Sequence, residues 1–145
     1  MKKDVMLEIK GIQKVDGESD EIELTTRGEF SKTHGNYYIR YRESELTGMD
    51  NVTTVLKIEG DRRVTMTRSG NMRSQLIVEK GMRHQCLYDM GFDSWVIGVI
   101  GDSIEPELDD NGGNIRFKYT LDLNTAVTSE NEVRINIREA GIPNA

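Results

Sequence analysis

The chain of 145 residues has few features, such as disulfides, that stabilise a fold other than by the packing of side chains. It contains one cysteine, Cys86, so no disulfide can form within the chain. Its longest apolar run, Trp95 to Gly101, is far shorter than the roughly 20 apolar residues that a membrane helix needs. The amino end alternates charged and apolar residues and offers no apolar signal core. We therefore expect a soluble cytoplasmic protein without a membrane segment.

The sequence also lacks the short motifs of common catalytic and cofactor sites. It contains no Gly-x-Ser-x-Gly, no Gly-x-x-x-x-Gly-Lys and no Gly-x-Gly-x-x-Gly. Acidic residues at predicted strand ends, such as Glu43, are interpreted as solvated surface groups. We expect neither an enzyme nor a bound cofactor.

The charge is acidic overall but unevenly distributed. The formal net charge is −6, which argues against general nucleic-acid binding because phosphate neutralisation needs a basic face. From Lys57 to Arg83, however, seven Lys and Arg face only three Asp and Glu. The middle of the chain is its basic part.

In place of a helical period, the chain shows alternation with period two, which puts successive side chains on opposite faces of a strand. Between Ile115 and Asn124 the odd positions are apolar and the even ones, Asp122 included, form the wet side. The pattern restarts between 132 and 139, which predicts a hairpin. The same analysis predicts the remaining strands, each followed by turn residues, at 4–15, 21–33, 36–43, 52–59, 62–68, 74–80, 82–89 and 93–100.

About eight to ten strands, joined in consecutive hairpins, hide their apolar faces most simply in one all-β domain spanning residues 1–145, an antiparallel up-and-down barrel. Pro106 is expected to end or kink a strand. A barrel of this size holds either packed side chains or one small ligand, and the sequence does not decide between them.

Four stretches in order resemble the YwiB-like family of uncharacterised bacterial proteins. They are "YYIRYRESELTG" at 37–48, "VTMTRSGNM" at 64–72, "YDMGF" at 88–92 and "NIRFKYTLDL" at 114–123. The resemblance implies a calycin-type, lipocalin-like β-barrel, and it brings no established activity or ligand. The Gly-x-Trp that typical lipocalins carry near the amino end is missing, because the single tryptophan is Trp95.

The segment 36–44 interleaves aromatic and basic residues. The phase of Tyr37 and Tyr41 is the more apolar and should face the interior, which leaves Tyr38, Arg40 and Arg42 outside. A stacking platform for single-stranded nucleic acid presents several aromatics on one exposed face, whereas this face has one. We expect no nucleic-acid partner.

Arg68 follows the inward phase of Met66 and should point inward near the end of its strand. A charge there needs a partner. Either Arg68 is structural and pairs with an internal carboxylate or turn carbonyls, or it anchors an anionic head group at the barrel mouth. The sequence leaves both alternatives open.

His84 and Cys86 share the inward phase with Tyr88. Two ligands of a zinc could come from such a strand, but four are usual and no further His or Cys completes the set, so we expect no metal site. No third group orients a Cys–His nucleophile pair, and we interpret both residues as buried and structural.

Two functions from different classes remain. The first is a barrel that binds a small apolar or amphipathic anionic ligand in a cavity on the order of 300 Å³ or more. Its lining would comprise Tyr37, Tyr41, Met66, His84, Tyr88, Trp95, Phe117 and Tyr119, with Arg68 at the head group. The second is a solid barrel that acts as an interaction or regulatory module, through a homodimer or a protein partner.

Overall fold

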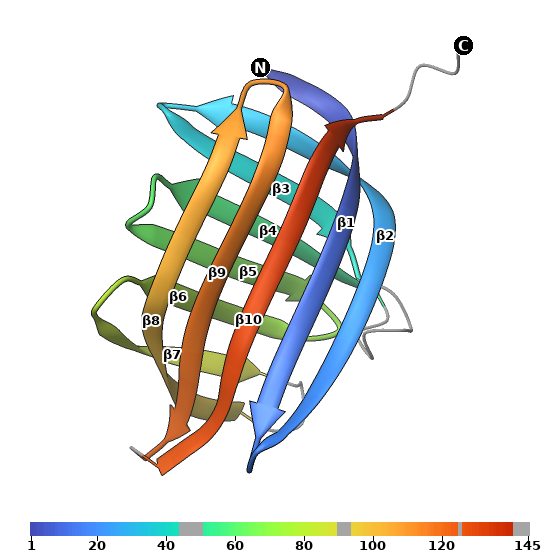
Figure 1. The fold of residues 1–145 in the computed structure, drawn as a ribbon. Helices are drawn as coiled ribbons and strands as arrows, with labels where there is room; N and C mark the ends of the chain where they lie inside the picture. Colours follow the sequence, from blue (N-terminus) through green and yellow to red (C-terminus); the bar gives the residue numbers. More distant parts are fainter. Residues whose placement is uncertain (44–50, 90–93, 125, 141–145) are drawn as a thin grey trace.

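The chain forms a closed barrel of antiparallel strands (Figure 1). The computed structural model describes residues 1–43, 51–89, 94–124 and 126–140. The strands are β1 (Lys2–Val15), β2 (Glu18–Thr33), β3 (Asn36–Arg42), β4 (Val52–Glu59), β5 (Arg63–Gly70), β6 (Arg73–Glu79), β7 (Arg83–Asp89), β8 (Ser94–Asp109), β9 (Gly112–Leu123) and β10 (Ala126–Glu139). Each strand pairs with its neighbours in sequence, and β1 pairs with β10 to close the barrel. The predicted antiparallel up-and-down barrel is confirmed.

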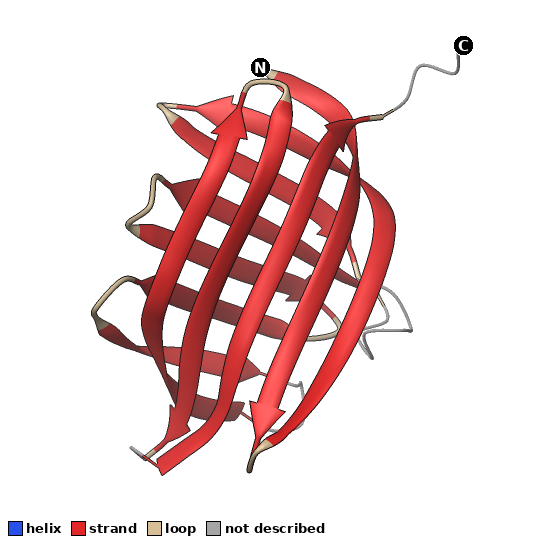
Figure 2. Ribbon diagram, in the orientation of Figure 1, coloured by secondary structure: helices blue, strands red, loops and turns tan. Residues whose placement is uncertain are grey.

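The part of the chain that the structure describes contains strands and turns but no helix (Figure 2). Accordingly, none of these residues belongs to a helix that is long and apolar enough to cross a membrane. In Figure 1 the long strands β8, β9, β10, β1 and β2 form one wall, and β3 to β7 cross behind it. The space between the two walls is the interior of the barrel.

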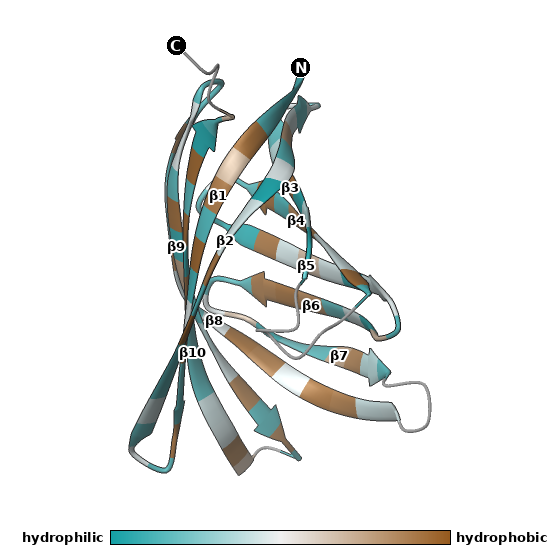
Figure 3. Cartoon of the chain, turned by 90° about the vertical axis from the view of Figure 1, so that its right-hand side faces the viewer, coloured by the Kyte–Doolittle hydropathy of each residue, from teal (hydrophilic) through white to brown (hydrophobic). Residues whose placement is uncertain are grey.

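Alternating side chains fill that interior. In β4, Val52, Thr54, Leu56 and Ile58 are buried, while the residues between them are half-buried. Figure 3 shows the same alternation of hydrophobic and hydrophilic residues along the other strands. The fully buried side chains include large ones, among them Phe30 and Phe117, so most of the interior is occupied.

Two strands are longer than the sequence suggested. β8 continues through Pro106 to Asp109 instead of ending near residue 100. Proline is tolerated there because β7 pairs with β8 only up to Ile100, so the later part of β8 has a ladder with β9 on one side. β10 begins at Ala126, and a register shift between Val127 and Ser129 lets the pairing continue where a turn was expected.

Candidate functional site

One end of the barrel interior opens into a pocket of about 180 Å³, here called the mouth pocket. It lies between the β1–β2 hairpin, β9 and β10 on one side and β3, β4 and β5 on the other. It is smaller than the cavity of roughly 300 Å³ that we expected, because large inward side chains fill the rest of the barrel. An apolar cavity of about 150 Å³ holds benzene, so the mouth pocket is sized for a molecule only slightly larger.

The body of the mouth pocket is apolar. Its apolar lining consists of Ile9, Ile12, Ile22, Leu24, Leu56, Met66 and Val133, beside Tyr41 and Tyr119. Gly11 of β1 also lines it, and a Cβ atom built on Gly11 would meet nothing within 4 Å. The pocket is therefore widened where this strand has no side chain.

A single arginine contributes the positive charge of the mouth pocket. Arg68 lies near the end of β5 with its side chain 13% exposed, and its Nε lies 3.7 Å from Glu43 Oε2. The Glu43 side chain is only 3% exposed and also accepts a hydrogen bond from the Thr54 hydroxyl. Glu43 is thus a buried partner of Arg68, and its interpretation as a solvated surface group was wrong.

The contact between Arg68 and Glu43 is too long for a hydrogen bond. Among the described residues, Arg68 Nε and Ser74 Oγ are the buried side-chain polar atoms that lack a hydrogen-bond partner. The two residues are directly paired across β5 and β6. Of the two, Arg68 lines the mouth pocket and Ser74 does not. Because a buried polar atom without a partner costs roughly 1–3 kcal/mol, Arg68 Nε indicates capacity for a polar ligand atom there.

Two buried tyrosines share this environment. Burial raises the pKa of Tyr41 far above its usual range, and the nearby Glu43 carboxylate raises it further, while the Arg68 guanidinium acts in the opposite sense. Burial also raises the pKa of Tyr119, and the charge of Arg68 again partly offsets this rise. Both phenols therefore stay neutral at ordinary pH, and a neutral phenol can donate a hydrogen bond.

The structure brings together four of the predicted site residues. Arg68, Tyr41, Met66 and Tyr119 all line the mouth pocket. Phe117 is fully buried deeper in the core, where it stacks near Tyr119 with ring centroids 6.1 Å apart.

Other predicted residues lie elsewhere. Tyr37 stacks on Phe30 with ring centroids 5.0 Å apart, and its hydroxyl donates to Asp110 at the β8–β9 turn. Tyr88 is half-buried against the core. Trp95 is 48% exposed because it is the second residue of β8, beyond the core layer, although it has the inward phase. None of these three residues lines the mouth pocket.

His84 and Cys86 lie on β7 away from the pocket. His84 Nε2 lies 2.9 Å from Glu79 Oε1. Cys86 is buried, its Sγ accepts a hydrogen bond from the Ile77 N–H, and burial raises the pKa of its thiol. The described residues contain no group of three His, Cys, Asp or Glu side chains that could hold a metal ion.

Sequence reasoning missed several pocket residues. Glu43 continues the inward phase of Tyr41, and that spacing would have placed it inside. Ile9, Leu24 and Val133 follow the inward alternation of their strands, but only strand pairing shows that they meet at one end of the barrel.

A second arginine–carboxylate pair lies on the outer face. Arg83 of β7 donates from Nε and Nη2 to the two carboxylate oxygens of Asp122 at 2.9 and 2.7 Å. The pair spans Gly98 of β8, where a Cβ atom would come within 2.5 Å of both side chains. Asp122 therefore lies on the outer face that its phase predicted, but its side chain is only 4% exposed because Arg83 covers it, so the expectation that it is solvated was wrong.

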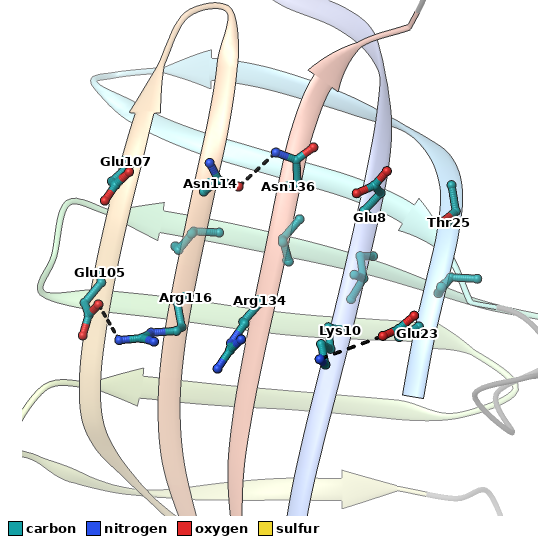
Figure 4. Close-up of a pocket in the computed structure, with 14 residues that line it drawn as sticks. Glu8, Lys10, Glu23, Thr25, Glu105, Glu107, Asn114, Arg116, Arg134 and Asn136 are labelled. Atoms are coloured by element: carbon teal, nitrogen blue, oxygen red, sulfur yellow. Dashed lines mark hydrogen bonds and ion pairs between the residues drawn. The ribbon is translucent and has the colours of Figure 1, made fainter. Parts of the chain in front are cut away.

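The outer face of the long strands carries a wide polar groove of about 730 Å³ (Figure 4). Arg116, Arg134 and Lys10 lie in one row across β9, β10 and β1, with Glu105 and Glu23 at its two ends. Arg116 pairs with Glu105 at 2.9 Å, and Lys10 lies 3.5 Å from Glu21. Arg134 contacts Glu132. Among the described residues, the groove's three cations, Lys10, Arg116 and Arg134, each contact a carboxylate, so none of them is left free to select an anionic ligand.

Comparison with known proteins gives consistent results. A crystal structure of the YwiB protein from Bacillus subtilis superposes with a TM-score of 0.85 at 22% identity, covering 97% of this chain and 94% of that one. By sequence, the uncharacterized β-barrel protein YwiB of Bacillus subtilis (strain 168) is 27% identical over 118 residues, which is 81% of this chain and 80% of the relative. The model of a domain of unknown function, DUF1934, matches residues 7–135, and the chain therefore belongs to this family of YwiB-like β-barrel proteins.

Proposed function

We propose that the barrel binds a small amphipathic molecule in the mouth pocket. The observation that carries the proposal is Arg68 Nε, which is buried at the pocket without a hydrogen-bond partner. A carboxylate or carbonyl oxygen of the ligand accepts from Arg68, as ionised groups make the stronger hydrogen bonds. The apolar part of the ligand packs against Leu56 and Met66.

The volume restricts the class of ligand. About 180 Å³ accommodates a single ring or a short branched chain with one polar group, and it excludes the long-chain ligands of a hollow barrel. Glu43 lies beside Arg68, and Asp20 and Glu132 also line the pocket, so these three carboxylates disfavour a second negative charge on the ligand. A compact monocarboxylate or its neutral analogue fits these conditions best.

The test is a titration with benzoate, followed through the Met66 methyl signal by NMR. Gly11→Leu fills the pocket from a position with free space, and Arg68→Met removes the guanidinium. We expect a saturable shift that Gly11→Leu abolishes and Arg68→Met weakens about tenfold, the effect of one charged hydrogen bond.

Arg116→Met is the matched control, because Arg116 lies on the outer face and pairs with Glu105. It should leave benzoate binding unchanged, and thermal unfolding confirms that each variant folds. Titration with benzyl alcohol measures the apolar contribution separately. A Met66 shift that does not saturate, or one that persists in Gly11→Leu, would contradict the proposal.

The second candidate function is self-association, and a pair of exposed apolar residues favours it. Leu87 of β7 and Val96 of β8 are paired in register, with 54% and 57% of their surfaces exposed. Sedimentation of the wild type beside Leu87→Glu tests this candidate. A dimer that the substitution dissociates supports it, and a monomer at high protein concentration rejects it.

A further inference from the structure

Three arginines gather on the outer face of the β2–β3 pair. Arg40 and Arg42 lie two residues apart on β3, which places their Cα atoms roughly 7 Å apart on one face. Arg27 on β2 adjoins them, one residue beyond the Gly28–Tyr41 pair. All three arginines are exposed.

Most other arginines pair with a carboxylate, whereas these three form no ion pair with any residue that the structure describes. No carboxylate of the described residues lies within 4.0 Å of Arg27, Arg40 or Arg42. Glu29 is directly opposite Arg40 in register, but it pairs with Lys2 at 2.8 Å. Lys2 and Arg40 together hold the pKa of Glu29 below its usual value.

Three adjacent guanidinium groups repel one another, and like charges at neighbouring strand positions destabilise a sheet. Arg116, Arg134 and Lys10 are also neighbours, across β9, β10 and β1, but there the repulsion is offset because each of these cations contacts a glutamate. A cluster that lowers stability in a chain of net charge −6 is a local departure from the surface pattern, and such departures are typical of functional sites.

The cluster also surrounds a depression of about 380 Å³. Arg27, Arg40 and Arg42 line it together with Thr53, whose hydroxyl is a further donor, and with Glu29, whose carboxylate pairs with Lys2. This volume lies within the range of small-molecule sites. A neighbouring depression of about 420 Å³ shares Arg40 and adds Tyr38, an aromatic ring beside the cations.

We infer that Arg27, Arg40 and Arg42 form a binding site for a phosphate group on the outside of the barrel. A guanidinium group can donate two parallel hydrogen bonds to two oxygens of one phosphate. Three guanidinium groups line this depression, and a phosphate group carries up to two negative charges. The phosphate belongs either to a small phosphorylated molecule or to the backbone of a short single-stranded nucleic acid, since both present the same oxygens. The site is separate from the mouth pocket and does not depend on its ligand.

Calorimetric titration at low ionic strength distinguishes the two sources. The probes are adenosine monophosphate, adenosine as its phosphate-free control, and a short single-stranded oligouridylate. The test variant is Arg40→Gln/Arg42→Gln. Its matched control is Arg116→Gln/Arg134→Gln, which removes the same two charges from ion-paired positions on the other wall.

We expect the full chain to bind at least one phosphate probe and not adenosine. The test variant should weaken that binding by at least about tenfold, while the matched control leaves it nearly unchanged. Binding of adenosine monophosphate identifies a small phosphorylated ligand, and binding of the oligouridylate alone identifies a nucleic-acid backbone. Each supports the phosphate site.

The inference is overturned if neither phosphate probe binds. It is also overturned if both double variants weaken binding equally, because the effect would then follow net charge alone. Thermal unfolding separates loss of the site from loss of the fold. Since the substitutions relieve repulsion, the test variant should unfold at a temperature no lower than that of the wild type.

Discussion

Two arginine–carboxylate pairs each reach across an intervening strand of the barrel, and they differ in almost every respect. Arg83 and Asp122 form a closed fork with contacts of 2.9 and 2.7 Å on the outer face. Arg68 and Glu43 lie 3.7 Å apart at the mouth pocket, and Arg68 Nε has no hydrogen-bond partner. The first pair is closed by two hydrogen bonds, whereas Arg68 Nε of the second pair has a hydrogen bond left to donate to another polar atom.

The difference shows why residue type and inward phase are insufficient to assign a role to an arginine. The first pair joins β7, β8 and β9 because Gly98 leaves room for the two side chains to meet above it. The second pair reaches from the end of β3 to β5, and both of its residues line the mouth pocket. We therefore expect Arg83 to contribute to stability, and we propose ligand contact only for Arg68.

The largest expected effect comes from breaking the closed pair at its glycine. Gly98→Val places side-chain atoms where Arg83 and Asp122 now meet, so the fork must open or the backbone must shift. We expect the free energy of unfolding to fall by about 3 kcal/mol in chemical denaturation. Gly11→Val is the control, since its Cβ meets nothing within 4 Å. Equal losses in both variants would show that the fork contributes no more than ordinary strand geometry.

A smaller effect separates the two pairs when each is replaced by neutral side chains. Arg83→Met/Asp122→Asn should lower the unfolding temperature, because the completed fork and its cross-strand link are lost. Arg68→Met/Glu43→Gln should leave it unchanged or raise it, because a poorly satisfied buried pair is often no better than neutral groups. The reverse order would show that Arg68 is the structural arginine.

The smallest effect is on tyrosine ionisation. The charge of Arg68 partly offsets the burial that raises the pKa of Tyr41 and Tyr119. Arg68→Met should therefore move their ionisation to still higher pH in an ultraviolet absorbance titration, whereas Arg83→Met should not. An equal shift in both variants would contradict the placement of Arg68 beside the phenols.

The same raised pKa values determine the sign of the pH dependence. The folded state keeps its phenolic protons when the unfolded chain loses them near pH 10, so stability falls as the pH rises above that value. Denaturation at increasing pH should show this loss, and it should be steeper in the wild type than in Tyr119→Phe. Identical slopes would place Tyr119 outside the low-polarity interior.

The sequence predicted the barrel well because alternation and turn residues are local signals. It placed Arg68, Tyr41, Met66 and Tyr119 on the inward face, and all four line the mouth pocket. It did not predict the burial of Asp122, which depends on an arginine 39 positions away reaching over a glycine. Such long-range contacts require strand register, which one sequence does not specify.

The size of the cavity could not be predicted from the sequence either. Inward phase does not say whether a side chain packs or lines a space, and Phe117 packs while Tyr119 lines the pocket. Trp95 has the inward phase but lies too near the start of its strand to reach the core. The pocket consequently occupies one end of the barrel and not its length.

Native mass spectrometry tests the occupancy of the mouth pocket most directly. The wild type, Gly11→Leu and Arg116→Met are purified without denaturation from the organism that makes the protein, and each native mass is compared with its denatured mass. We predict a small, defined excess mass in the wild type and in Arg116→Met that is missing from Gly11→Leu. A bare polypeptide in the wild type, or the same excess in Gly11→Leu, would contradict a ligand in the mouth pocket.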